Sequence, residues 1–153
     1  MSKEELLKTA NLLPQVSDEM ASEYASKRES LVEAMNALML ARADVVAMVG
    51  ENNIEMMKDN HSNHARFLES IFYKHNAEVL LDTVLWVFRA YRSRNFSSTY
   101  WSAQLNSWLE IYKSELSTEC YKAVYPYYSW MQINIPAFNK LAEEKFDAPL
   151  SSH

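Results

Sequence analysis

Glycine is almost missing from this chain of 153 residues, because Gly50 is the single glycine and only four prolines accompany it. A β-rich fold of this length needs many tight turns, which are usually made with glycine, asparagine and proline. The same shortage excludes a glycine-rich phosphate loop and a G-x-S-x-G nucleophile elbow. Since 48% of the residues are hydrophobic, a sizeable core can form. The composition therefore predicts long helices with few connections.

Cysteine is as scarce as glycine. Cys120 is alone, so no disulfide can form within the chain, which is typical of a reducing compartment. A nucleophilic thiol needs a base to activate it, and no pattern in the sequence marks one, so we expect Cys120 to be structural. With the phosphate loop and the nucleophile elbow excluded as well, we predict that the protein is not an enzyme.

Positive charge is also in short supply, since the formal net charge is -5. Binding to nucleic acid needs a basic face, and the densest basic stretch, residues 89–94, lies at an expected helix C-terminus, where the helix dipole favours cations. No run approaches the roughly 18 apolar residues that a membrane-spanning helix needs, and residues 1–5 lack the apolar segment of a signal peptide. We expect a cytoplasmic protein that binds neither nucleic acid nor a membrane.

Hydrophobic spacing predicts one all-α domain over residues 1–153, with about six to seven helices. Ser2 and Glu5 fit a capping box for a helix within residues 1–14. Ser17 is the expected N-cap of a stretch that reaches Gly50 as one helix or as two with a bend. Asp59 or Asn60 is expected to cap the next helix. Further helices are expected over about 78–92, 98–116 and 118–145, the last one kinked or broken at its prolines, and residues 147–153 are expected to fray.

The segment from 78 to 92 is apolar on nearly all sides. A helix of that character should be buried on most sides, so we expect it at the centre of the fold.

His61 and His64 are the one pair of residues in the sequence whose type and spacing could form a binding site. Residues three apart share a helix face, so the two imidazoles could meet one ligand, and His75 lies further along the same stripe. A zinc site needs four ligands, or three and a water, and the sequence does not supply them, so we predict no metal site. Contact with an organic ligand is one interpretation of the pair. The other is that both are buried or capping histidines.

Aromatic residues are plentiful in the second half of the chain. They could line a pocket whose hydroxyl groups orient a guest, although core packing is the commoner use of aromatics at helical spacing. Their surplus also favours an exposed apolar face, and hence a homodimer formed by residues 97–116 and 118–145. The expected interface side chains are Trp101, Trp108, Tyr112 and Tyr128.

Two segments carry a resemblance to a known family. Residues 95–108 (NFSSTYWSAQLNSW) look like the start of the G helix in the globin-like sensor domains at the N-terminus of stressosome sensor-scaffold subunits, and residues 133–139 (INIPAFN) look like part of their terminal helix. The resemblance covers roughly residues 55–145. It implies a globin-like helical sandwich that acts in bacterial stress signalling, as a dimer that packs its last two helices.

A weaker likeness overlaps the first. Residues 61–68 (HSNHARFL) and 81–86 (LDTVLW) are similar to helical regions that accompany cobalamin-binding domains in bacterial regulators. The cobalamin-binding domain itself is absent from the sequence, so this likeness implies a regulatory helical module and no cobalamin binding.

In the globin resemblance, the helix over about 78–92 is the one that carries the proximal histidine of haem globins. That position falls at or near Tyr91, the helix contains no histidine, and His64 falls on the distal side. We therefore expect a haem-free member of the family. A haem-binding globin for gas sensing or O₂ binding is the alternative, because tyrosine can also ligate haem iron.

The sequence thus predicts a sensory or regulatory domain that binds a small apolar ligand or a signalling partner protein. The expected pocket lies between the histidine stripe and the helix over 78–92 and is formed by His61, His64, Leu68, Phe88 and Tyr91. A helical adaptor with a solid core and no ligand is a further alternative.

Overall fold

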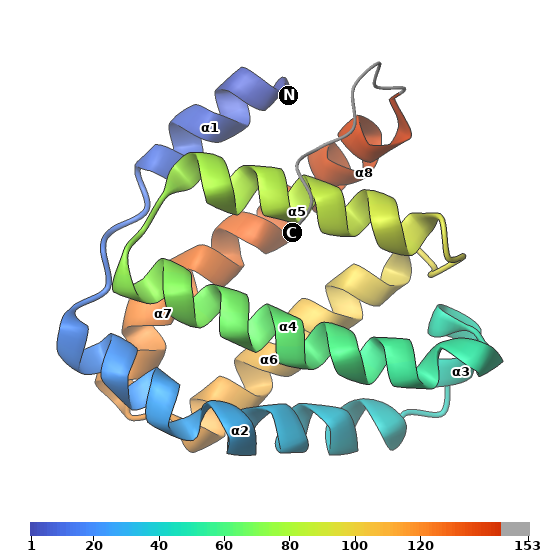
Figure 1. Ribbon diagram of the computed structural model, residues 1–153, viewed down its shortest axis with the longest axis horizontal. Coiled ribbons are helices and arrows are strands. Elements are labelled where there is room, and N and C mark those ends of the chain that lie inside the picture. The colour runs from blue at the N-terminus through green and yellow to red at the C-terminus, as the bar shows by residue number, and fades with distance from the viewer. Residues whose placement is uncertain (145–153) are drawn as a thin grey trace.

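The computed structural model describes residues 1–144, and within them the chain forms α-helices and one short 3-10 helix but no β-strand (Figure 1). The all-α prediction is therefore confirmed for this part of the chain. The expected frayed tail, residues 147–153, lies outside the described residues. The helices are α1 (Lys3–Asn11), α2 (Asp18–Leu40), α3 (Val45–Val49), the 3-10 helix η1 (Glu51–Asn53), α4 (Ile54–Tyr73), α5 (Ala77–Arg92), α6 (Thr99–Glu115), α7 (Thr118–Ile133) and α8 (Ile135–Glu143).

Serine side chains begin three of these helices, and two of them, Ser2 and Ser17, are the caps that the sequence predicts. Ser2 accepts a hydrogen bond from the Glu5 amide at 3.1 Å and completes the capping box of α1. The hydroxyl oxygens of Ser17 and Ser117 accept from backbone amides in the first turns of α2 and α7. Each cap satisfies an amide that would otherwise lack a partner at the helix start.

The stretch from Ser17 to Gly50 is divided into α2 and α3, the second of the two forms expected for it. Gly50 ends α3 with a φ of 94°, in the left-handed region that favours glycine. The expected cap of α4 is wrong, since Asp59 and Asn60 lie inside a helix that begins at Ile54. The 3-10 turn after Gly50 leads directly into α4, and Asn53 holds this corner by donating to the carbonyl oxygens of Val49 (2.8 Å) and Arg94 (3.0 Å).

The last predicted helix is broken, one of the two outcomes that its prolines indicate. Helix α7 ends at Ile133 and α8 begins at Ile135, with Pro136 in the first turn of α8. Asn134 between them donates its side-chain amide to the Trp130 carbonyl at 2.8 Å. Pro126 lies within α7, which continues through it.

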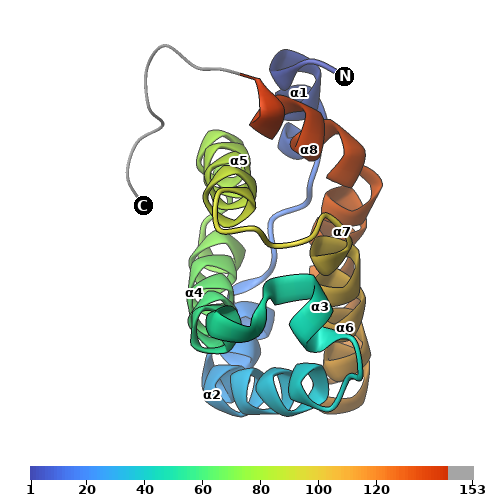
Figure 2. The same ribbon diagram turned by 90° about the vertical axis from the view of Figure 1, so that its right-hand side faces the viewer.

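The helices form two layers with closed ends. Figure 2 shows α4 and α5 in one layer and α6 and α7 in the facing layer. Helix α2 lies across one end, where it contacts α4, α6 and α7. At the other end α1 and α8 both pack against α5. No helix among the described residues combines the length and the apolar character that crossing a lipid bilayer would require.

Helix α5 does not lie at the centre of the fold, so that expectation is wrong. It lies beside α4 in one of the two layers, and Val79 is 41% exposed. Most of the largest fully buried side chains come from α2, α6 and α7, and include Tyr24, Trp108, Tyr112 and Tyr128.

The four aromatics expected at a dimer interface lie inside the single chain. Trp101 is 5% exposed, and Trp108, Tyr112 and Tyr128 are 0% exposed. The prediction for these side chains is wrong, because the aromatic faces of α6 and α7 cover the core of their own chain. A homodimer formed through other residues stays a prediction.

Candidate functional site

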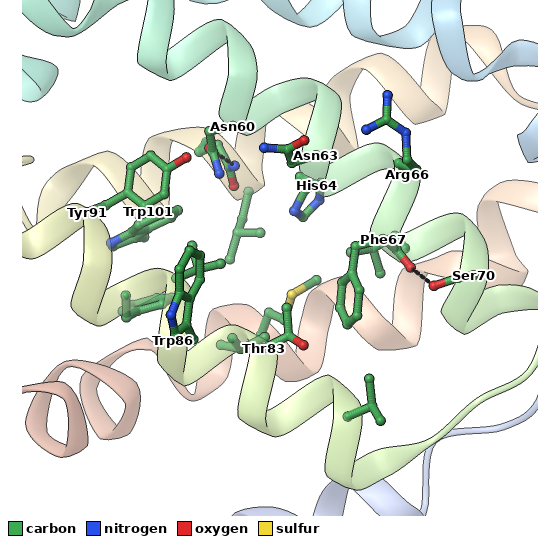
Figure 3. Close-up of a pocket in the computed structure, with 18 residues that line it drawn as sticks. Asn60, Asn63, His64, Arg66, Phe67, Ser70, Thr83, Trp86, Tyr91 and Trp101 are labelled. Carbon is green, nitrogen blue, oxygen red and sulfur yellow. Dashed lines mark hydrogen bonds between the residues drawn. The ribbon is translucent and has the colours of Figure 1, made fainter. Parts of the chain in front are cut away.

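A cavity of about 610 Å³ opens between the two layers (Figure 3). Its volume falls within the range of about 300 to 1,000 Å³ that is usual for small-molecule sites. Most of the wall is apolar or aromatic. Its lining residues are Asn60, Asn63, His64, Arg66, Phe67, Leu68 and Ser70 from α4, Val79, Thr83, Val84, Trp86, Val87, Phe88 and Tyr91 from α5, Trp101, Gln104 and Leu105 from α6, and Met131 from α7.

This cavity explains why α5 is apolar on nearly all sides. One face of α5 is buried in the core without lining the cavity, and it includes Leu80 and Leu81; α5 also packs on α1 and α8. A second face, with Val84, Val87 and Phe88, lines the cavity. An apolar pattern that predicts complete burial therefore marks a helix with one face on the core and another on a cavity.

His64 lies in the cavity wall as a half-buried side chain. Its Nε2 atom is 2.6 Å from the Tyr128 hydroxyl oxygen, and its ring stacks on Trp108 with centroids 5.2 Å apart. Burial and, to a smaller extent, the nearby His61 together lower the pKa of His64 to about 3. The imidazole is therefore neutral at physiological pH.

His61 does not line the cavity, although the sequence predicts it there. It is fully buried, and its Nδ1 atom is 2.6 Å from the side-chain oxygen of Asn36 on α2. Burial lowers the pKa of His61 to about 4. The two imidazoles thus do not meet one ligand, and His61 is a core histidine, the other interpretation that the sequence allows. His75 lies beyond the end of α4, where its Nε2 is 2.8 Å from the Ala10 carbonyl oxygen.

The structure brings four of the five predicted pocket residues together. His64, Leu68, Phe88 and Tyr91 all line the cavity. Phe88 stacks on Trp101 from α6, with ring centroids 4.6 Å apart.

A chain of hydrogen-bonded side chains runs from the cavity wall into the core. His64 meets the hydroxyl of Tyr128, Tyr128 meets Tyr112 at 2.5 Å, and Tyr112 meets Tyr24 at 2.8 Å. We call these four residues the His64–Tyr24 chain. They come from α4, α7, α6 and α2. Burial raises the pKa of each of the three tyrosines well above its usual value, so all three keep their protons.

Sequence reasoning misses this chain because its members lie far apart along the sequence. Tyr24 and Tyr112 are separated by 88 positions, and Tyr112 and Tyr128 by 16. Each is placed on a helix by apolar spacing, which shows that it faces inward but does not show which hydroxyl it meets. A buried tyrosine does need a hydrogen-bond partner, and that need is the one available signal.

Asn60 is a further cavity residue that the sequence does not single out. Its side-chain oxygen accepts from the Tyr100 hydroxyl at 2.8 Å and from the Gln104 amide at 3.0 Å. Across the cavity on α5, the hydroxyl of Thr83 is buried and has no partner among the described residues. These groups give a mostly apolar space a few oriented polar atoms.

Metal binding has no support in this geometry. Within residues 1–144, no group of three or more histidine, cysteine, aspartate or glutamate side chains is arranged to hold a metal ion. Cys120 is buried, and burial raises the pKa of its thiol to about 11, so the reactive thiolate is scarce.

Comparison of the chain with protein-family models, with curated proteins and with solved structures finds no match. The resemblance to stressosome globin-like domains accordingly stays a prediction.

Proposed function

We propose that this chain is a non-enzymatic sensory or regulatory domain that binds a small, largely apolar ligand between α4 and α5. The observation that carries this proposal is the cavity of about 610 Å³, with a mostly apolar wall and a few oriented polar groups. Protein interiors are otherwise close-packed, and empty space forfeits the contacts that its wall atoms could make. An apolar guest would restore those contacts, and its own apolar surface would be removed from water, which is favourable.

Sensing requires that the ligand bind two packings of the protein with different affinity. The cavity lies where a guest would achieve this, because one of its walls is α5. Helix α5 is joined to α1 by the ion pair of Lys3 and Asp82 (2.8 Å) and to α8 by that of Arg92 and Glu143 (3.0 Å). A guest that changes the separation of α4 and α5 would therefore move the contacts of both terminal helices.

The likeness to stressosome sensor domains supports a role in bacterial stress signalling, in the cytoplasm and through a homodimer or a signalling partner. In that proposal α5, together with α1 and α8, transmits the effect of ligand binding to the partner. The partner surface then includes one of the terminal helices.

Binding can be tested with a neutral fluorescent probe, N-phenyl-1-naphthylamine. We expect its fluorescence to rise on mixing with the protein and the rise to be smaller in Val87→Phe, which places a larger side chain in the cavity from α5. Native mass spectrometry of freshly purified protein should show a bound small molecule, and fatty acids or other apolar ligands should raise the melting temperature. A protein that takes up neither the probe nor any such ligand would instead be the helical adaptor, which binds no ligand and acts only through contacts with other proteins.

Haem is the second candidate ligand, because the cavity lies between α4 and α5 and its wall contains His64 and Tyr91. The fit is poor, however. Helix α5 offers no histidine, and Nε2 of His64 is already hydrogen-bonded to Tyr128. We expect no Soret band in the visible spectrum of purified protein, and a band that His64→Ala removes would establish the haem protein instead.

A further inference from the structure

The His64–Tyr24 chain contains three hydroxyl groups and three hydrogen bonds. Raised tyrosine pKa values and a lowered histidine pKa keep all three phenols protonated and the imidazole neutral. Each hydroxyl proton can fill one of the three bonds only if the chain runs in a single direction. In that direction Tyr24 donates to Tyr112, Tyr112 donates to Tyr128, and Tyr128 donates to Nε2 of His64.

Any other arrangement leaves a buried hydroxyl proton without an acceptor. If Nε2 of His64 carried a proton, four protons would compete for three bonds. The proton left over would belong to a tyrosine, because Tyr24 and Tyr128 are near each other but are not joined by a hydrogen bond, and no hydrogen bond joins any of these hydroxyls to a further acceptor within residues 1–144. A buried donor without a partner is costly, so the chain holds Nε2 as an acceptor.

A neutral imidazole has one ring proton, so the proton of His64 then resides on Nδ1. No hydrogen bond joins Nδ1 to any described residue, and His64 points from α4 into the space between the layers (Figure 3). The chain thus makes His64 a hydrogen-bond donor toward the cavity.

Asn60 also offers a hydrogen-bond donor to the cavity. Its side-chain oxygen accepts from Tyr100 and Gln104, so its side-chain N–H groups remain available to Tyr91 and to the cavity. The Thr83 hydroxyl on the opposite wall can donate or accept. The two groups whose role is fixed, Nδ1–H of His64 and the side-chain N–H of Asn60, are both donors and therefore suit a hydrogen-bond acceptor on the guest.

The charge of the wall argues against an anionic guest. Arg66 is the one cation in the described lining, and it is exposed and points away from the cavity in Figure 3. A carboxylate bound beside the neutral His64 would be buried without a counter-charge, which is unfavourable. The flat side chains of Trp86, Phe88 and Trp101 suit a ring-bearing guest.

We infer that the ligand of this cavity is a neutral, ring-bearing molecule with a carbonyl oxygen, which accepts a hydrogen bond from Nδ1–H of His64. This inference rests on the proposed ligand-binding function. The three buried tyrosines act as positioning residues, since they select the ring nitrogen that carries the proton.

The tautomer can be measured without any ligand. Long-range ¹H–¹⁵N NMR of the whole protein should show His64 protonated at Nδ1 and unprotonated at Nε2. In Tyr128→Phe, which removes the donor to Nε2, we expect signals of both tautomers. Tyr127→Phe is the matched control, because it removes another buried hydroxyl that is not part of the His64–Tyr24 chain. The Tyr127 hydroxyl donates instead to the Pro14 carbonyl at 2.7 Å. A wild-type His64 protonated at Nε2 would overturn the inference, even if Tyr128→Phe does not fold.

Binding can be tested with three probes of nearly equal shape: 2-acetylnaphthalene, 2-ethylnaphthalene and 2-naphthoate. By tryptophan fluorescence titration, we expect the ketone to bind about threefold to tenfold more tightly than the ethyl compound, the gain of one neutral hydrogen bond. The naphthoate should bind more weakly than the ketone. His64→Phe, which keeps the apolar bulk, should abolish the preference for the ketone, and Tyr127→Phe should preserve it.

The outcomes separate this inference from the function on which it rests. Equal binding of the ketone and the ethyl compound would refute the carbonyl assignment and leave an apolar binding site. Tightest binding of the naphthoate would refute a neutral guest. If neither these probes nor N-phenyl-1-naphthylamine binds, both the proposed function and the ligand class fail.

Discussion

Tyr112 is the middle member of the His64–Tyr24 chain and makes two of its three hydrogen bonds. Tyr112→Phe keeps the ring but removes the acceptor of the Tyr24 hydroxyl, which is fully buried. We expect the free energy of unfolding in urea to fall by about 1 to 3 kcal/mol. The control is Tyr125→Phe at an exposed position, where the change should stay within about 0.5 kcal/mol. Equal effects at the two positions would contradict the buried chain.

The buried histidines make stability depend on pH. The pKa is about 4 for His61 and about 3 for His64 in the folded chain, against 6.5 for the unfolded side chain. Below pH 6.5 the unfolded chain binds more protons, so stability is complete above that value and falls as the pH falls. At pH 5 we expect a loss on the order of 1 to 2 kcal/mol for each histidine.

Urea unfolding at pH 7.5, 6 and 5 measures this loss. His61→Gln, which keeps a donor for Asn36, should reduce the fall between pH 7.5 and 5 by about half, because it removes one of the two titrating groups. An unchanged fall would show that His61 does not titrate as its burial implies.

At the scale of residues, the sequence predicts what faces inward better than what each side chain meets. Helical spacing places His64, Leu68, Phe88 and Tyr91 correctly on two facing helices. It cannot separate His61 from His64, because residues three apart share a broad face. The difference depends on Asn36 of α2, which takes His61 as its partner from another part of the chain.

At the scale of helices, α5 offers a matched pair of substitutions. Val87 lines the cavity, whereas Leu80 is fully buried and does not line it. In Val87→Phe the added ring enters open space, so we expect stability to be unchanged or raised. In Leu80→Phe the added volume meets close-packed neighbours, which should cost about 1 to 3 kcal/mol.

Thermal and urea unfolding of both variants provide the measurement. If Val87→Phe proved as destabilising as Leu80→Phe, the space between the layers would already be filled by protein, and the proposed binding site would lose its basis.

Helix boundaries show which signals are local. Ser2, Ser17, Asn76 and Ser117 each accept from an amide in the first turn of the helix that follows, so a nearby residue is enough to predict them. The start of α4 is set by less local contacts, since Asn53 binds the carbonyl of Arg94 across the fold. The misplacement of α5 has the same origin, because an apolar face on a cavity and an apolar face in the core have the same sequence pattern.

At the scale of the whole molecule, the position of α5 connects the cavity to α1 and α8. One side of α5 lines the cavity and another contacts α1 and α8. The opposite wall, on α6 and α7, belongs to the aromatic core. A guest would therefore contact the aromatic core on one wall and, on the other, the helix that packs on α1 and α8. A ligand-dependent change of packing requires that the guest bind two positions of α5 with different affinity.

The aromatic residues of α6 and α7 distinguish a folding core from a dimer interface. Trp108 is 0% exposed and packs its ring against His64 and Tyr112. If Trp108 held two chains together, Trp108→Ala would yield folded monomers. Since it lies in the core, we expect instead a loss of about 3 to 5 kcal/mol, a large share of the roughly 5 to 15 kcal/mol that stabilises a typical domain. Circular dichroism melting with analytical ultracentrifugation measures both quantities. The exposed Tyr125→Ala should leave melting temperature and sedimentation unchanged, and a folded, dissociated Trp108→Ala would return this residue to a dimer interface.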